Sequence, residues 1–295
     1  MKPDAFATVM ATGIVSIAAL DNGFRIVSGA LAAVAAVVLV LLVIAAAIRL
    51  RPDFDDVDVP LQLFTFVAAC AVVGTRLAWS PAVHATLALA AALVWVGLAA
   101  VTARLVWRQR WVGLRDRARG GWELASVATS GLAIVAADAG HPRLAVALLA
   151  GAVCVYVLMT GLIVWRFSHD PSALELRQPD VWILMGGAAI ATLAGDHIDR
   201  AGVGAVRPVT VVTWIVASLW MPLLVAVSVQ IRGGNWWAAV FPLGMYSSAT
   251  YASAVETGWS ALRAVSLVFF WIALFAWVAV AAVAATLRFR RENVR

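Results

Sequence analysis

The sequence predicts an all-α integral membrane protein, with ten transmembrane helices arranged as five helical hairpins in a ring and the odd-numbered helices lining a central pore. Three observations carry this prediction. The 295 residues are 63% hydrophobic and only 13% charged. The charged residues divide the chain into ten long charge-free runs, and these runs alternate in length and in composition. Such a composition excludes a water-soluble globule, a disordered chain and a disulfide-stapled secreted module.

The ten charge-free runs define the expected helices. A helix crosses the hydrocarbon core of a bilayer, which is ~30 Å thick, with ~20 residues that rise ~1.5 Å each. Ten such runs leave no room for a soluble domain, so we predict a single transmembrane domain over residues 1–295. Its helices are expected at about 4–21, 26–49, 60–79, 81–106, 122–139, 143–167, 180–197, 207–231, 235–256 and 262–288.

The odd-numbered runs differ from the even-numbered runs. The first four odd-numbered runs hold only 14 to 17 residues, whereas every even-numbered run holds 22 or more. A short helix places its charged ends at or inside the interface, which is tolerated where those ends face protein or a water-filled cavity. The odd-numbered runs also collect Gly, Ser and Thr. Small residues permit close helix packing or leave open space along an axis, and we predict a lined pathway, with tight packing alone as the alternative.

A hairpin of about 58 residues recurs five times, as is typical of repeated supersecondary units. Five hairpins of the same sense can close as a ring, whereas an inverted-repeat transporter of two five-helix halves has a different symmetry. Four odd-numbered helices end in an acid that is followed by an arginine, and we expect these residues to form interfacial ion pairs. The pairs are Asp21/Arg25, Asp138/Arg143, Asp196/Arg200 and Glu256/Arg263.

The basic residues predict the orientation of the chain in the membrane. Of the 22 lysines and arginines, 16 lie on the side that carries both termini, in segments such as the Arg104–Arg119 loop and the Arg288–Arg295 tail. Because cytoplasmic loops carry an excess of Lys and Arg, we predict a multi-pass protein of the cell membrane with both termini in the cytoplasm. The pI of about 10.3 therefore reflects topology, and no nucleic-acid partner is expected.

Ionisable residues stand at the ends of the charge-free runs and not at their centres, which disfavours a buried carboxylate relay. Asp4, Glu123 and Asp180 begin odd-numbered helices, where we expect them to cap the helix and complement its positive end. The fourteen tryptophans are expected mainly at helix ends, as interfacial anchors. Cys70 and Cys154 lie inside apolar runs and are expected to pack as small core residues.

The sequence carries no sign of catalysis. The four histidines lack the spacing of metal ligands, and there is no nucleophile elbow, P-loop or dinucleotide fingerprint. We therefore predict that the protein is not an enzyme and needs no cofactor and no metal. A pH-sensing role for His197 stays open, because imidazole titrates near neutrality.

One stretch near the C-terminus, Trp236–Tyr246, carries a proline inside an otherwise helical segment. Pro242 removes a backbone donor and kinks the helix. The kink can turn Phe241 toward an axis lined by small side chains, or Phe241 can be an ordinary core residue. The residues that we expect to line or border the pathway are small or weakly polar ones on odd-numbered helices: Thr12, Gly13, Gly131, Gly187 and Ser248.

Two segments resemble the tellurite-resistance/C4-dicarboxylate transporter family, which includes bacterial TehA, fungal malate permeases and plant guard-cell slow anion channels. The segments are Phe6–Ser16 and the stretch with Trp236, Trp237, Phe241, Pro242 and Gly244. The resemblance implies five hairpins around a pore in each subunit, and commonly a trimer. It also implies anion conduction or dicarboxylate transport, with a pore gate formed by Phe241 and aimed by Pro242.

We therefore predict a membrane anion channel or transporter for small anions or C4-dicarboxylates, such as chloride, nitrate, malate or tellurite. Its partners would be the anion, the lipid bilayer and further copies of the chain in a trimer. Selectivity would come from pore width, hydroxyl and backbone dipoles, and a basic vestibule. One alternative is a proton-coupled dicarboxylate carrier of the same fold, with a titrating group such as Asp196 or His197. A ten-helix metabolite exporter and a membrane enzyme or scaffold are weaker alternatives.

Overall fold

The computed structural model describes residues 1–170, 178–231 and 233–292, so that Arg177, Arg232 and Arg295 of the charge bias lie outside the described residues. The described ranges form ten α-helices and four short 3₁₀ helices. The α-helices are α1 (Ala7–Asp21), α2 (Arg25–Arg49), α3 (Asp58–Arg76), α4 (Pro81–Arg115), α5 (Leu124–Asp138), α6 (Pro142–His169), α7 (Ile183–Arg200), α8 (Arg207–Ser228), α9 (Trp237–Thr257) and α10 (Ala261–Glu292). The 3₁₀ helices are η1 (Pro3–Phe6), η2 (Gly120–Glu123), η4 (Pro179–Trp182) and η5 (Gly204–Val206).

The helices confirm the all-α membrane class. Nine helical segments within the described ranges are long and apolar enough to cross a membrane, and α9 is the helix that does not reach this hydropathy. Burial separates the two sets of helices. The most apolar window of α1, α3, α5 and α7 is 67% to 94% buried, whereas that of every even-numbered helix is 11% to 22% buried. The even-numbered helices therefore carry the lipid-facing surface.

Short 3₁₀ turns lengthen three of the odd-numbered helices. η1, η2 and η4 run into α1, α5 and α7 without a break. In the segment Pro3–Asp21, four residues at ~2.0 Å and fifteen at ~1.5 Å give ~30 Å, the thickness of the hydrocarbon core. The charge-free runs are therefore shorter than the helices, because the first turn includes an acidic residue.

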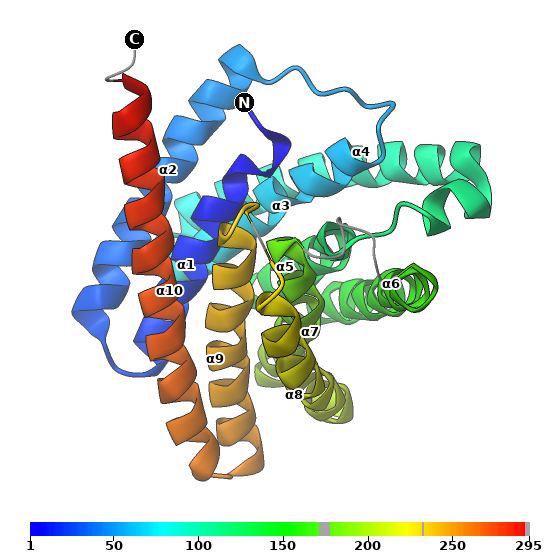
Figure 1. Ribbon diagram of the computed structural model, residues 1–295. Coiled ribbons are helices and arrows are strands. Elements are labelled where there is room, and N and C mark those ends of the chain that lie inside the picture. Colours follow the sequence, from blue (N-terminus) through cyan, green and yellow to red (C-terminus); the bar gives the residue numbers. More distant parts are fainter. Residues whose placement is uncertain (171–177, 232, 293–295) are drawn as a thin grey trace.

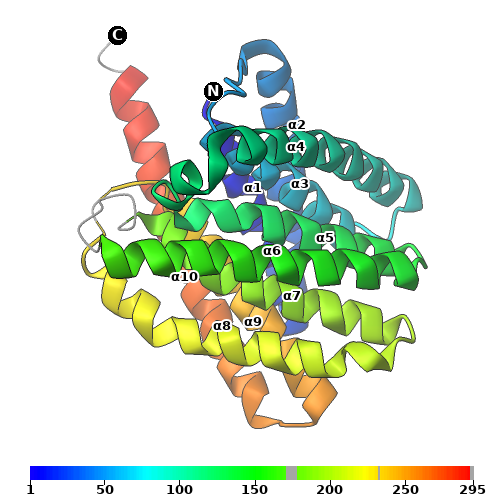
Figure 2. The ribbon, with the colours of Figure 1, turned by 90° about the vertical axis from the view of Figure 1, so that its right-hand side faces the viewer.

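The helices pair as consecutive antiparallel hairpins, and the odd-numbered helices follow one another in a closed order. α1 contacts α3, α3 contacts α5, α5 contacts α7, α7 contacts α9, and α9 returns to α1. Figure 1 shows α9 beside α10, and the start of α1 and the last turn of α10 at the same end of the molecule. Figure 2 shows α4, α6 and α8 lying across one face, in front of α5 and α7.

Glycines bring the odd-numbered helices into close contact. A Cβ atom on Gly13 of α1 would lie 2.7 Å from Cγ1 of Val72 on α3. A Cβ on Gly131 of α5 would lie 3.0 Å from Ala71, and one on Gly244 of α9 would lie 3.1 Å from Ile14 of α1. At these positions the glycine backbone therefore lies directly against side chains of the neighbouring helix, as in membrane helices with small residues at the interface.

Tryptophans in three of the even-numbered helices tie their hairpin to the next one. Their indole nitrogens donate hydrogen bonds to threonine hydroxyls on the odd-numbered helix of the following hairpin. The bonds are Trp95 to Thr129 (2.9 Å), Trp214 to Thr250 (3.1 Å) and Trp277 to Thr12 (2.9 Å). The last bond joins α10 to α1 and so links the final hairpin to the first. These tryptophans lie within helices, so the expectation of anchors at helix ends does not describe them.

Replacement of Gly13 by leucine should prevent the close contact of α1 with α3. The side chain would collide with Val72, and overpacking of this kind costs ~1–3 kcal/mol or more. We expect Gly13→Leu to lower the midpoint of thermal unfolding in detergent, measured by fluorescence-detected size exclusion. Gly151→Leu on α6 is the matched control, because no atom would lie within 4 Å of its Cβ. Equal midpoints for the two variants would contradict this packing.

The bond between Trp277 and Thr12 should contribute to stability as a pair. A double-mutant cycle of Trp277→Phe and Thr12→Val, followed by denaturant unfolding in mixed micelles, should yield a coupling energy of ~0.5–1.5 kcal/mol, the net contribution of a hydrogen bond. Trp107→Phe, at a side chain that is 88% exposed, should leave stability unchanged. A coupling energy near zero would show that the bond does not join the hairpins.

Candidate functional site

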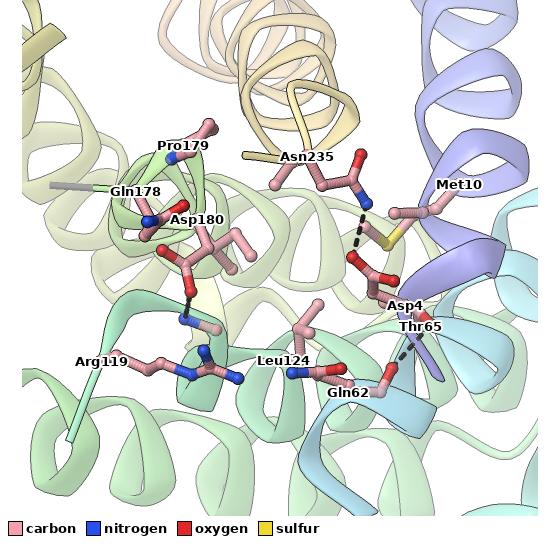
Figure 3. Close-up of a pocket in the computed structure, with 14 residues that line it drawn as sticks. Asp4, Met10, Gln62, Thr65, Arg119, Leu124, Gln178, Pro179, Asp180 and Asn235 are labelled. Atoms are coloured by element: carbon pink, nitrogen blue, oxygen red, sulfur yellow. Dashed lines mark hydrogen bonds between the residues drawn. The ribbon is translucent and has the colours of Figure 1, made fainter. Parts of the chain in front are cut away.

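A cavity of about 170 Å³ opens at the end of the molecule that carries the N-terminus; we call it the proximal cavity. Every odd-numbered helix contributes to it through its N-terminal half or the turn that precedes it. The polar residues that line it are Asp4, Gln62, Thr65, Arg119, Gln178, Asp180 and Asn235. Figure 3 shows the side chains of Asp4 and Asn235 pointing toward one another, with Arg119 and Asp180 on the opposite side of the cavity.

The polar groups of the proximal cavity are bonded between helices. Asn235 Nδ2 donates to Asp4 Oδ2 at 2.7 Å, and the Gly121 amide donates to Asp180 Oδ2 at 3.1 Å. Arg119 pairs with Asp58 at 3.2 Å. Two buried atoms, Arg119 Nε and Asp180 Oδ1, have no hydrogen-bond partner among the described residues. Two residues that line the cavity therefore retain one donor and one acceptor without a partner among the described residues.

The charge of the proximal cavity differs from the basic vestibule that the sequence predicts. Arg119 is the cation among the described lining residues, and Asp4 and Asp180 are acids. Asp58 compensates the charge of Arg119 at a distance of 3.2 Å. The arginines of the neighbouring loop, Arg117 among them, line a separate cavity together with four aspartates of residues 53–58. Basic residues thus gather at this end of the chain, but acids neutralise them locally.

A second, smaller cavity of about 40 Å³ lies between the C-terminal halves of the same helices; we call it the distal cavity. All five odd-numbered helices line it, and its walls are mostly apolar. The lining includes Ile14, Val72, Gly131, Ile190 and Met245. His197 also lines it, and its Nδ1 lies 2.7 Å from Asp138 Oδ1.

The predicted ion pairs at the distal end form in part. Asp196 pairs with Arg200 at 2.7 Å, as expected from the sequence. Asp138 pairs with His197 instead of Arg143, and Glu256 lies 4.0 Å from Arg207 instead of pairing with Arg263. The described residues give Asp21 no ion pair. Contacts between neighbouring hairpins therefore replace two of the four predicted local pairs.

Phe241 lies between the levels of the two cavities. On α9, Ala238 lines the proximal cavity and Met245 lines the distal one. Phe241 follows the first by three residues and precedes the second by four, so all three share one face of the helix. Its side chain is fully buried. A Cβ on Gly186 of α7 would lie 3.2 Å from its ring and 3.1 Å from Pro242.

The predicted lining residues occupy different surroundings. Of the five, Gly131 lines the distal cavity. Thr12 accepts its hydrogen bond from Trp277 on α10, and Gly187 faces Tyr156 on α6. Gly13 packs on α3, and Ser248 is buried in α9. Their part in a conduit stays a prediction, as does the role of Phe241 and Pro242, neither of which lines one of the two cavities.

The expectation that acids cap the odd-numbered helices through hydrogen bonds is wrong. None of the caps of η1, α5 or η4 includes a side-chain hydrogen bond. Asp4 accepts from Asn235, Asp180 from the Gly121 amide, and Glu123 from Thr160. Each acid therefore joins two helices. The signal for this role in the sequence is the recurrence of one acid at the start of successive odd-numbered helices.

Comparison with known proteins agrees with this architecture. A family described as "Voltage-dependent anion channel" (SLAC1) matches residues 1–285. The chain is also 30% identical, over 140 residues, to two uncharacterized membrane proteins of Mycobacterium tuberculosis, MT1776 of strain CDC 1551 and Rv1735c of strain H37Rv. The matched region covers 42% of this chain and 71% of each relative. The chain belongs to the SLAC1 voltage-dependent anion channel family, which confirms the resemblance seen in its first and ninth helices.

Proposed function

We propose that the protein conducts small anions along the axis that its five odd-numbered helices enclose. One observation carries the proposal: both cavities are lined by all five odd-numbered helices, one cavity at each end of the bundle. A path between them would run through the middle of the closed helix order α1–α3–α5–α7–α9. The family match supports anions as the conducted species.

The gate of this path would be the ring of Phe241. At its level the other odd-numbered helices contribute small or flexible side chains, such as Ala68 and Gly186, and both Phe241 and Ala68 are fully buried. An apolar constriction excludes water, and an anion that crosses it must give up its hydration. Pro242 packs on the same glycine as Phe241 and would hold the ring in place.

The substrates that we propose are chloride, nitrate and C4-dicarboxylates such as malate, with tellurite as a further candidate. Arg119, with a free Nε–H, would attract an anion into the proximal cavity. Because Asp58 compensates its charge, the attraction would be weak, and conduction requires binding that is weak enough for the ion to leave.

We further propose that the protein works as a homotrimer in the cell membrane with both termini in the cytoplasm. The excess of basic residues at the end with the termini supports this orientation. The proximal cavity would then face the cytoplasm and the distal cavity the outside.

The proposed channel is distinguished from a proton-coupled carrier by flux measurements in liposomes. For a channel, the reversal potential should follow the anion gradient alone, at every imposed pH gradient. For a carrier, protons should move in a fixed ratio to the anion. Absence of flux for chloride, nitrate and malate alike would contradict both.

Removal of the Phe241 ring should open the path. We expect Phe241→Ala to raise unitary anion conductance severalfold, because water can then enter the constriction, and Phe241→Leu to raise it less. Pro242→Ala should disturb gating, because the ring loses its support. Planar bilayer recordings of purified, monodisperse protein measure both effects.

Phe270→Ala is the matched control for the gate. Phe270 is as fully buried as Phe241, but it lies on α10 and stacks on Phe24 at 5.1 Å. Its loss should cost ~3–5 kcal/mol of stability, without any increase in unitary conductance. A folded Phe241→Ala protein with the conductance of the wild type would remove the gate from this proposal.

A further inference from the structure

Glu123 is a carboxyl group buried behind the axis of the odd-numbered helices. It is the last residue of η2 and is fully buried within the protein. Thr160 of α6 donates a hydrogen bond of 2.5 Å to its Oε1. Oε2 is also buried, and none of the described residues donates a hydrogen bond to it.

No cation in the described part of the chain pairs with Glu123. The titratable group that faces it is Tyr156 of α6, whose hydroxyl accepts a 2.8 Å bond from Trp220. The charged residues on the other elements around η2 bond elsewhere. Asp58 of α3 bonds to Trp122 and Arg119, Asp180 of η4 bonds to Gly121, and Arg166 of α6 bonds to the carbonyl of Ala118.

Two consecutive glycines of α7 connect this carboxyl group with the Phe241 ring. A Cβ on Gly187 would lie 2.9 Å from the Tyr156 ring and 3.5 Å from Glu123 Oε2. A Cβ on Gly186 would lie 3.2 Å from the Phe241 ring. α7 is therefore held between Tyr156 and Glu123 on one side and Phe241 on the other. A shift of α7 away from α6 must change its contact with Phe241, since neither glycine has a side chain that could absorb it.

The residues on either side of Glu123 in the chain lie at the proximal cavity. Gly121 and Leu124, which lie on either side of Glu123 in the chain, both line the proximal cavity. Glu123 itself points away from the cavity, toward Thr160 and Gly187. A small local opening of η2 would expose its carboxyl group to water in the cavity.

We propose that Glu123 is a proton-binding site, and that its protonation links the pH at the proximal end to the packing of α7 against Phe241. The inference rests on the proposed function, because its readout is the conductance that Phe241 limits. The compact site accommodates the neutral acid, whereas a carboxylate needs water or a further donor at Oε2. Loss of the proton to water in the proximal cavity therefore favours a state in which the contact of α7 with α6 is loosened and hydrated.

The sign of the pH effect follows from this difference. In the structure the Glu123 carboxyl group and the Phe241 ring are both fully buried. The conformation with the closed constriction is therefore the one that favours the bound proton. A rise in pH on the proximal side should shift the population toward the hydrated, conducting state.

The experiment measures anion flux in liposomes at varied pH on the proximal side, with chloride, nitrate and malate as probes. Wild-type flux should rise about fivefold or more from acid to alkaline pH, which is the lower end of typical coupling between two sites. Glu123→Gln, which cannot ionise, should give a flat profile at the acid level. Glu256→Gln is the matched control, because this acid lies at the distal end and near Arg207. It should keep the wild-type response.

One further variant and one spectroscopic measurement keep the test decisive. If Glu123→Gln does not fold, Thr160→Val, which removes the donor to Oε1, should displace the pH profile, and an unchanged profile would overturn the proposal. A carbonyl stretching band of a protonated carboxyl group should be present in infrared spectra of the wild type and absent in Glu123→Gln. Full pH response in Glu123→Gln, together with high conductance in Phe241→Ala, would overturn this inference alone. Unchanged conductance in Phe241→Ala would contradict the gate itself.

Discussion

The close approach of the odd-numbered helices is the contact on which the rest of this structure depends. Where Gly13 meets Val72 and Gly244 meets Ile14, the glycine backbone of one helix lies directly against a side chain of the next helix. This proximity lets five helices follow one another in a closed order with only small cavities between them. It also brings Trp277 within 2.9 Å of Thr12, so that an indole N–H inside the membrane finds an acceptor. In a medium without water, that bond has no substitute.

Much of the fold could be predicted from charge alone. Charged residues cannot cross lipid cheaply, so their positions in the sequence mark the ends of helices. The direction in which a residue faces could not be predicted in the same way. The helices α1, α3, α5 and α7 are buried over most of their surface, and a helix that is buried nearly all round carries little periodic signal. The buried hydroxyl group of Thr12 points toward α10, where it accepts a hydrogen bond from Trp277, a residue 265 positions away in the sequence.

The contacts of the acids at the starts of the odd-numbered helices could not be predicted from the local sequence either. Local rules assign Asp4 and Asp180 to their own helix ends, and this assignment would satisfy backbone donors in an isolated helix. In the bundle, Asn235 and the Gly121 amide compete for these carboxylates. The tertiary contacts prevail because the chain begins each of these helices with a 3₁₀ turn, so that the acid lies beside a neighbouring helix. Phe241 could be singled out because Pro242 is visible in the sequence, whereas nothing local distinguishes Glu123 from the other acids.

The modest hydropathy of α9 bears on how the protein is made. α9 is the helix that falls short of the others in apolar character, and its interior carries Pro242 and several hydroxyl side chains. A single helix of this kind gains little free energy when it moves by itself from the translocation channel into lipid, because each polar group opposes this transfer. α10 follows after only a short turn and is strongly apolar. We therefore expect α9 and α10 to insert together, with the least apolar helix packing into the protein interior as the strongly apolar α10 enters the bilayer.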